Sequence, residues 1–130
     1  MKARTVQAPR LIVSYGLDSS RLQQLSLFCD RENITLRPAL PGEADCTVGY
    51  LCGFKGFDPA PECEQPPQLE CLIFSGFDRR SLSETVDALR TAGLKVDLKA
   101  VCTPSNQAWK LSALIGELAK EHEYMTGGKK

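Results

Sequence analysis

Side chains that could hold a ligand are concentrated in two short turns of the C-terminal half. The first turn is Gly76-Phe77-Asp78, and the second, Thr103-Pro104-Ser105-Asn106, leads to the only tryptophan, Trp109. Hydroxyls, an amide and open helix amides beside an aromatic ring can hold small anionic or amide-bearing ligands. The competing interpretation is structural, because Asp78, Thr103 and Asn106 could cap helices and the tryptophan could fill the core.

The candidate residues share a position at or just beyond the end of an expected strand. The ligand-binding candidates are Gly76, Phe77, Asp78, Lys99, Thr103, Ser105, Asn106 and Trp109. Gly16 and Asp18 follow an earlier apolar run in the same pattern and form a secondary candidate pair. Either aspartate could instead act as the general base of a small enzyme.

The six cysteines predict no metal site. Three of them, Cys29, Cys71 and Cys102, fall within helix or strand patterns, where thiols are usually packing residues. The other three lie in the irregular middle of the chain, at Cys46, Cys52 and Cys63. No CxxC pair or nearby histidine completes a zinc set there, so we expect neither a metal nor a cofactor. A middle-loop cysteine acting as a thiolate remains a second enzymatic alternative.

The only histidine, His122, lies between two glutamates near the end of the last expected helix. A cation at that position interacts favourably with the helix dipole. We therefore interpret His122 as a surface residue.

A strand, a helix and a second strand position the main candidates. The run 69–75 is almost continuously apolar and predicts a buried central strand. Ser81 and Glu84 form a capping-box pattern, which predicts that a helix begins near Ser81 and ends at a left-handed Gly93. The alternating run 95–102 is typical of an edge strand, and Thr103-Pro104 predicts the start of the last helix.

The N-terminal half repeats this pattern sixty positions earlier. The run 11–15 matches the central strand, and Gly16, Leu17 and Asp18 match Gly76, Phe77 and Asp78. A helix is expected at about 21–31, with Asn33 closing it in the left-handed conformation. An edge strand follows at 34–39. Chance similarity between short apolar patterns is the competing explanation.

These elements predict an α/β fold in a single small domain. The favoured arrangement is a four-stranded, mostly parallel sheet in the order 2-1-3-4 with helices on both faces. In a fully parallel sheet, Gly16, Asp18, Gly76, Asp78 and the Thr103–Asn106 turn would meet at one edge. The alternative is an antiparallel, ferredoxin-like sheet in the order 4-1-3-2 with an added C-terminal helix, which moves Gly16 to the far end.

The domain organisation follows from length and composition. A chain of 130 residues with 42% hydrophobic residues suits one core. We expect a loose arm at 1–9, a short helix within 44–51, an irregular loop rich in proline and glycine at 53–68, and a polar tail at 124–130. Lys plus Arg and Asp plus Glu number 16 each, so no global field attracts nucleic acid or a membrane. Without a signal peptide or spanning segment, we expect a cytoplasmic protein.

The stretch from Cys71 to Glu123 resembles an uncharacterised family of small bacterial proteins, the domain of unknown function three-seven-eight-three. The resemblance is most specific in the Thr-Pro-x-Asn-x-x-Trp piece, where the family commonly continues with threonine in place of Lys110. The matching residues are Phe74, Gly76, Phe77, Ala88, Leu89, Arg90, Ala92, Gly93, Leu98, Lys99, Ala100, Val101, Thr103, Pro104, Asn106, Trp109 and the run 117–122. A family threonine could cap the last helix, so the lysine implies a start nearer Pro104. No activity comes with the resemblance.

The favoured function is a non-catalytic binding or regulatory module, because no nucleophile lies beside a base in the sequence. Its partner would be an unknown small molecule or another protein, and a homo-oligomer is compatible with the sequence. The small enzyme using Asp78, Asp18 or a loop cysteine is the alternative. Nucleic-acid binding is rejected because the chain is neutral and the third strand lacks a basic, glycine-rich pattern.

Overall fold

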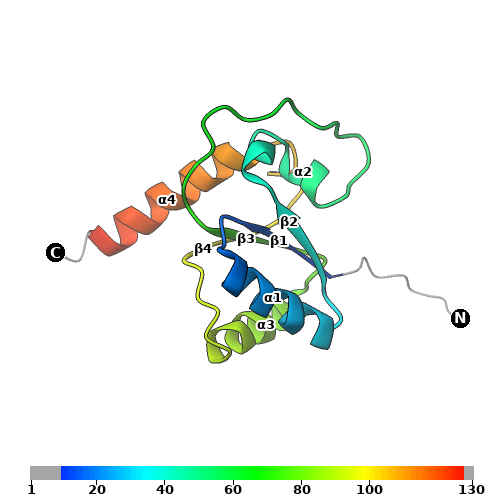
Figure 1. The fold of residues 1–130 in the computed structure, drawn as a ribbon, viewed down its shortest axis with the longest axis vertical. Coiled ribbons are helices and arrows are strands. Elements are labelled where there is room, and N and C mark those ends of the chain that lie inside the picture. The colour runs from blue at the N-terminus through cyan, green and yellow to red at the C-terminus, as the bar shows by residue number, and fades with distance from the viewer. Residues whose placement is uncertain (1–9, 128–130) are drawn as a thin grey trace, which may run out of the picture.

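The computed structural model describes residues 10–127 of the chain, so the expected arm at 1–9 lies outside the described residues. One four-stranded sheet in the order β2-β1-β3-β4 lies between two layers of helices (Figure 1). The elements are β1 (Leu11–Tyr15), α1 (Ser19–Arg31), β2 (Thr35–Ala39), the 3-10 helix η1 (Pro41–Glu43), α2 (Val48–Leu51), β3 (Cys71–Ser75), α3 (Arg79–Thr91), β4 (Leu98–Val101) and α4 (Leu111–Gly127).

The strand order and the two outer pairings confirm the favoured arrangement. β1 pairs with β2 and β3 pairs with β4, both in parallel. The two central strands pair antiparallel, with Val13 opposite Ile73, so Gly16 and Gly76 lie at opposite ends of the sheet. The expectation that both glycine turns meet at one edge is therefore wrong, and so is the 4-1-3-2 order of the ferredoxin-like alternative. A buried strand has the same apolar pattern beside a parallel or an antiparallel neighbour, so the local sequence could not distinguish them.

The internal repeat is present in the structure. β1 and α1 occupy 11–15 and 19–31, while β3 and α3 occupy 71–75 and 79–91, sixty positions later. Each helix ends in a left-handed residue, Asn33 with φ 58° and Gly93 with φ 81°. Because Val13 pairs with its own counterpart Ile73, the two units are related by a pseudo-twofold axis through that pair.

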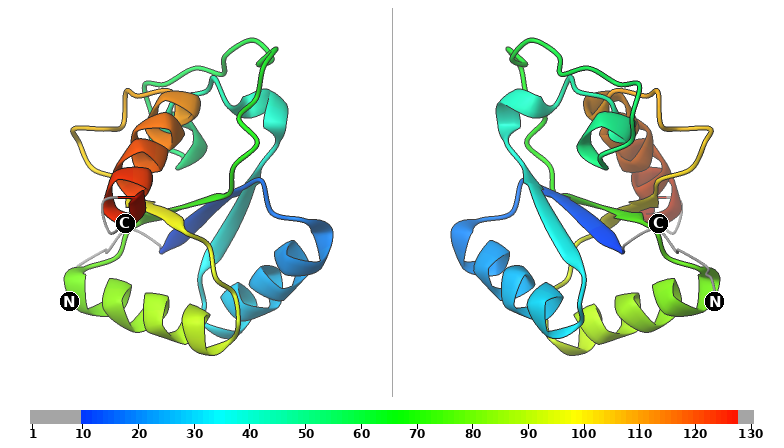
Figure 2. Two further views of the ribbon diagram at one scale, coloured as in Figure 1. Left: turned by 90° about the vertical axis from the view of Figure 1, so that its left-hand side faces the viewer. Right: turned by 90° about the vertical axis from the view of Figure 1, so that its right-hand side faces the viewer.

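The sheet is covered on both faces (Figure 2). β1 and β3 are almost wholly buried, so successive side chains enter two separate cores. The core between the sheet and α1 and α3 contains Ile12, Leu25, Phe28, Cys29, Ile34, Leu72, Phe74, Leu89, Leu94 and Val96. The core between the sheet and α2 and α4 contains Val13, Tyr15, Ala39, Ala44, Cys46, Val48, Leu51, Cys71, Ile73, Leu98, Leu111, Leu114 and Ile115.

Three predicted helix starts differ from the observed ones. α1 and α3 begin after the N-caps Asp18 and Asp78, two residues before the predicted starts, because each aspartate accepts a hydrogen bond from a first-turn amide. α4 begins at Leu111 rather than near Pro104. The N–H groups of Leu111 and Ser112 donate to the carbonyls of Cys46 and Ala44, at 2.8 and 2.7 Å. A distant segment therefore supplies the start of this helix.

The remaining expectations concern the middle and the end of the chain. The short helix expected within 44–51 is present as α2, which occupies only the second half of that range. Residues 53–68, expected to be an irregular loop, contain no helix or strand. α4 continues to Gly127, so most of the expected polar tail is helical and 128–130 lie outside the described residues. Within the described part of the chain, no helix has the length and apolar character to span a bilayer.

Candidate functional site

The two candidate turns leave the sheet at the same end, where the parallel strands β3 and β4 both finish. β3 and β4 are parallel neighbours, and the Cys102 N–H extends their pairing by donating to the Phe74 carbonyl at 2.8 Å. The chain then diverges: Phe77 packs on the core beneath α3, whereas residues 103–110 pass to the face covered by α2 and α4 (Figure 2). The two turns therefore begin side by side at the ends of β3 and β4 and then continue on opposite faces of the sheet.

The Gly76-Phe77-Asp78 turn is locally satisfied. The Phe77 ring meets Phe74 edge-on at a centroid distance of 5.5 Å, and the Arg10 guanidinium lies 5.8 Å from the Phe77 centroid. Asp78 accepts the Ser81 N–H at 2.7 Å, and the Ser81 hydroxyl accepts the Asp78 N–H at 3.0 Å. These bonds to Ser81 hold the pKa of the Asp78 carboxyl below its usual value. The geometry supports the capping interpretation of Asp78.

The Thr103–Asn106 turn is held closed by its own side chains. The Asn106 amide oxygen accepts the Thr103 N–H at 2.8 Å, and its amide nitrogen donates to the Val101 carbonyl at 2.9 Å. The Thr103 hydroxyl accepts the Asn106 N–H at 3.2 Å. Both ends of the turn are thus fixed by side-chain bonds, and Ser105 between them is exposed.

Trp109 is a surface residue with a fixed backbone. Its side chain is 42% exposed, so it does not fill the core. Its carbonyl accepts the Val48 N–H at 2.9 Å, and the Gln107 carbonyl accepts the Gly49 N–H at 2.8 Å. Phe54, which is 40% exposed, is tied to the same helix through Gly49. Two segments that bond to α2 thus each carry an exposed aromatic residue, Trp109 on one and Phe54 on the other.

The structure does not bring Lys99 to these turns. Its ammonium group donates to the Val96 carbonyl at 2.6 Å, and it lines a cavity together with α3 side chains such as Val86 and Arg90. Val96 precedes β4, so the Lys99 side chain is directed away from the Thr103 end of that strand. Lys99 therefore lies beside the outer strand β4 and is not part of the two turns.

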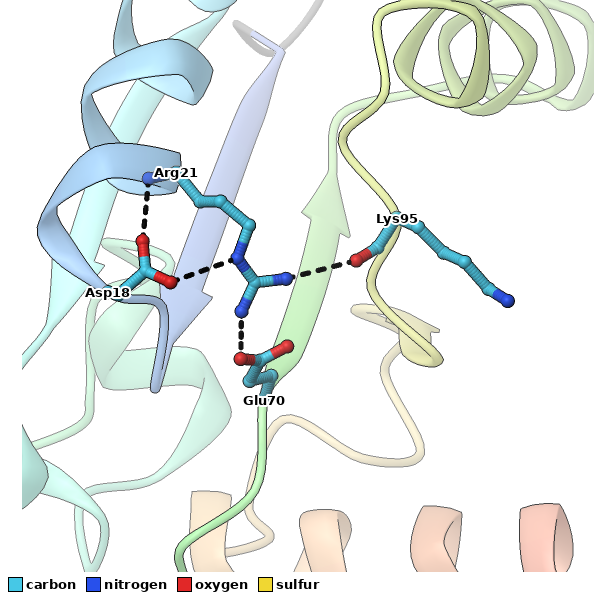
Figure 3. A network of polar contacts seen from close by, with 4 residues as sticks. All are labelled: Asp18, Arg21, Glu70 and Lys95. Atoms are coloured by element: carbon cyan, nitrogen blue, oxygen red, sulfur yellow. Dashed lines mark hydrogen bonds and ion pairs between the residues drawn. The ribbon is translucent and has the colours of Figure 1, made fainter.

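Gly16 and Asp18 lie at the opposite end of the two central strands, and Asp18 belongs to a network centred on Arg21 (Figure 3). Asp18 accepts the Arg21 N–H at 2.8 Å and lies 3.4 Å from the Arg21 guanidinium. The same guanidinium forms an ion pair with Glu70 and donates to the Lys95 carbonyl at 3.2 Å. Sequence reasoning missed Arg21 and Glu70, although Glu70 is the one charged residue in an otherwise apolar run.

A cleft of about 540 Å³ opens beside this network, between the lead into β3, the start of β4 and α4. Its lining includes the side chains of Glu70, Asp97 and His122, with 3.8 Å between the His122 Nε2 and an Asp97 carboxylate oxygen. His122 lies on the surface of α4, as predicted, with its side chain 44% exposed. Among the described residues, no group of three or more His, Cys, Asp or Glu side chains is arranged to bind a metal ion.

The titrating groups do not favour catalysis. Hydrogen bonds from the first turn of the helix lower the pKa of Asp18 as they lower that of Asp78, which makes both carboxylates weaker bases. Desolvation raises the pKa of Cys52 to about 12 and also raises the pKa of Cys102. Cys29 and Cys71 are buried, as predicted, and burial raises the pKa of their thiols to about 11 and about 12.

Comparison with known protein families gives a match in the second half of the chain. No curated protein matches the chain. No solved structure matches it either. Residues 70–125, which run from the lead into β3 through α3 and β4 to α4, match the family model of a domain of unknown function (DUF3783), so the family resemblance of this part of the chain is confirmed.

Proposed function

We propose that the protein is a small, non-catalytic binding or regulatory module. Its ligand or protein partner binds at the edge where β3 and β4 end, over the Gly76-Phe77-Asp78 and Thr103–Asn106 turns. We further place the protein in the bacterial cytoplasm. Its six cysteines are all free thiols, which is typical of a reducing compartment.

The observation that carries this proposal is the exposure of Trp109. An aromatic ring this large gains more free energy from burial than most side chains, and exposed rings on rigid backbone are enriched at binding surfaces. The Asn106 bonds and the contacts of α2 hold the surrounding backbone before any partner arrives. A preformed turn reduces the entropy lost on binding.

The enzymatic alternative has no specific support in the geometry. A general base works best with a pKa near the operating pH, whereas those of Asp18 and Asp78 are lowered. A nucleophilic thiol needs a lowered pKa, whereas that of Cys52 is raised to about 12. Binding without chemistry is therefore the function that the site supports best.

Trp109 also supplies the experiment, because it is the only tryptophan in the chain. The reduced full-length protein is titrated with nucleotides, amino acids and organic acids while intrinsic fluorescence and thermal unfolding are recorded. A ligand of the proposed surface changes the emission and raises the unfolding temperature. Truncating a central aromatic anchor typically costs about 2 kcal/mol, so Trp109→Ala should weaken binding about thirtyfold by calorimetry.

Leu27→Ala is the matched control, since Leu27 is an apolar side chain of α1 that is 60% exposed. This variant should bind with unchanged affinity. A ligand that binds Trp109→Ala and the wild-type protein equally would contradict the proposed site. A panel that changes neither the fluorescence nor the unfolding temperature would count against its small-ligand form.

A further inference from the structure

The outer strand β4 has an edge with no neighbouring strand among the described residues. The Cys102 N–H donates to the Phe74 carbonyl, and alternate residues of a strand bond to the same neighbour, so the even-numbered residues of β4 bond to β3. The backbone groups of Lys99 and Val101 therefore point away from β3. The Val101 carbonyl accepts the Asn106 amide at 2.9 Å. The Lys99 N–H, the Lys99 carbonyl and the Val101 N–H are left to pair with a further strand.

A cavity lies on each face of the sheet beside this edge. In the left view of Figure 2, β4 lies in front of the other strands, with α4 above it and α3 below it. The cleft of about 540 Å³ on the α4 side is lined by Leu98, which belongs to the core covered by α4. A cavity of about 270 Å³ on the α3 side is lined by Lys99 and by Leu89 of the core covered by α3. Successive residues of β4 thus line cavities on opposite faces.

The cleft on the α4 side has carboxylates beside β4. Its lining includes Glu70, which is paired with Arg21, and Asp97, which directly precedes the strand. The Asp97 side chain is 55% exposed. The nitrogen atoms of Lys95 and His122 lie 3.9 and 3.8 Å from its carboxylate oxygens, near the outer limit of an ion pair. Asp97 can therefore accept a closer bond from a basic side chain that enters the cleft.

The cavity on the α3 side has cationic side chains beside apolar ones. Its lining includes Arg90, Lys95 and Lys99. The Lys99 ammonium group donates to the Val96 carbonyl at 2.6 Å, and the Arg90 guanidinium lies 3.3 Å from the Asp87 carboxylate on the exposed surface of α3. An acidic side chain that enters this cavity would be attracted by these cations, while its methylene groups would contact the apolar lining.

We infer that the edge of β4 binds an extended segment of a partner protein, which adds to the sheet as a further strand. The backbone of this segment bonds to Lys99 and Val101, and its side chains alternate between the two cavities. Basic side chains enter the cleft on the α4 side, and acidic side chains enter the cavity on the α3 side. This surface is the side of β4 rather than the turns beyond its end, so it does not depend on the proposed function.

The charges favour such a segment over a second copy of this chain. Two β4 edges that pair antiparallel are related by a twofold axis perpendicular to the sheet, so each face continues as the same face of the other copy. The cations on the α3 side would then meet the same cations, and Asp97 would lie on the same face as its own counterpart. Like charges brought together in this way destabilise the pairing. A segment with opposite charges on its two faces has no such repulsion.

The test measures the binding of fluorescein-labelled, end-capped peptides of about eight residues to the full-length protein by fluorescence anisotropy. The first peptide has lysines on one face of an extended strand and glutamates on the other, with valine and threonine between them. A second peptide of the same composition has both charges on one face. The first should bind about tenfold more tightly than the second. Equal affinities, or no change in the anisotropy of the first peptide, would overturn the proposal.

Variants of β4 separate strand addition from general attraction between charges. Val101→Pro removes an outward N–H without changing the charge, and an edge strand tolerates proline at such a position. It should weaken binding of the first peptide about tenfold, whereas the matched control Val101→Thr should bind as the wild-type protein does. Asp97→Asn should weaken binding about threefold. Glu84→Gln, which removes a carboxylate from an exposed ion pair of α3, should have no effect.

Modified peptides keep the test decisive if Val101→Pro does not fold. Backbone N-methylation at alternate positions blocks one edge of the first peptide and leaves the other edge free. Methylation along one edge should abolish binding to the wild-type protein, and methylation along the other should not. Equal binding of both methylated peptides would show that no strand is added. A dimer of the wild-type protein that is lost in Val101→Pro, as measured by sedimentation, would assign the edge to a second copy and overturn the proposal.

Discussion

The two strand-helix-strand units have the same backbone arrangement, but the turn between the first strand and the helix is held by different contacts in each. In the first unit, β1 to β2, the turn after β1 is covered by residues 68–70, and Arg21 bridges Asp18, Glu70 and the Lys95 carbonyl. In the second unit, β3 to β4, the equivalent position is Ser81, whose hydroxyl closes only the local cap of Asp78. The turn of the first unit is bonded to residues of the second unit, whereas the turn of the second unit makes its capping bonds within its own helix.

This difference distinguishes the buried positions of the repeat, which are constrained by packing, from the turn residues, which are constrained by their polar contacts. Two of the buried helix positions correspond in the two units, Leu25 with Thr85 and Cys29 with Leu89, because the same strand and helix geometry must fill the same layer. Asp18 and Asp78 cap their helices in the same way, but the residue three positions later differs, Arg21 in the first unit and Ser81 in the second. The edge with only local caps is the one that carries the proposed binding surface.

The largest effect that would test this comparison is expected at Gly16. An added Cβ there would lie 2.2 Å from the Leu69 carbonyl oxygen, on a backbone with φ +82°. Gly16→Ala should therefore lower the free energy of unfolding by about 3 kcal/mol in urea denaturation. Gly93→Ala is the control, because φ there is +81° but the space is open, and its cost should be about 1 kcal/mol. Equal losses would mean that residues 68–70 do not constrain the first turn.

The next effect concerns the residues at equivalent helix positions, Arg21 and Ser81. The Arg21 and Glu70 side chains are 26% and 39% exposed, so solvent screens their ion pair in part. Arg21→Ala should cost about 1.5 kcal/mol, since it also removes the bond to the Lys95 carbonyl. Ser81→Ala should cost about 0.5 kcal/mol, because it removes one capping bond. A double-mutant cycle of Arg21 and Glu70 with no coupling would show that the network does not tie the two units.

The pH dependence of stability should separate the ion pair between Arg37 of β2 and Glu43 from an exposed ion pair within α3. Arg37 of β2 holds Glu43 through bonds of 2.7 and 2.9 Å, which lower the Glu43 pKa from 4.5. A lowered pKa stabilises the fold above pH 4.5, and this stabilisation is lost as the pH falls through the folded-state pKa.

Glu43→Gln should therefore cost about 1 kcal/mol at pH 7 and progressively less in acid, as measured by denaturation at a series of pH values. The exposed pair of Arg80 and Glu84 in α3 provides the control, and Glu84→Gln should leave the profile unchanged. A constant difference between Glu43→Gln and the wild-type protein across this pH range would show that the ion pair does not stabilise β2.

The smallest effect is expected where the two units use different residues for the same backbone conformation. Asn33 and Gly93 both have positive φ after their helices. Asn33→Gly should change the free energy of unfolding by no more than about 0.5 kcal/mol, because relief of strain is offset by the flexibility of glycine in the unfolded chain. Asn33→Ala should lose about 1 kcal/mol in the same assay. Equal stability of these two variants would show that the left-handed turn imposes no constraint.

The sequence predicted the parts of the fold that local interactions determine. The buried strands, the left-handed residues Asn33 and Gly93, and the sixty-residue repeat could be predicted because each depends on a few neighbouring residues. The start of α4 could not, since its first amides are satisfied by Cys46 and Ala44.

The candidate site was predicted in part. The sequence located the two turns after β3 and β4, and their shared edge follows from the parallel pairing of those strands. It did not predict that the chain would leave this edge toward opposite faces, or that Trp109 would be exposed. Both depend on which face α4 covers, and an apolar helix stripe does not specify which of two apolar sheet faces it covers.

The amino-acid sequence by itself determined two similar units, each with a strand, a capped helix and an edge strand, because periodicity, caps and left-handed turns act over a few residues. Only the tertiary structure decided that the units meet through antiparallel central strands, with Val13 opposite Ile73. The physical reason is that strands buried on both faces have no sequence periodicity that specifies a neighbour's direction. Packing of α2 and α4 then determined which turn stayed exposed.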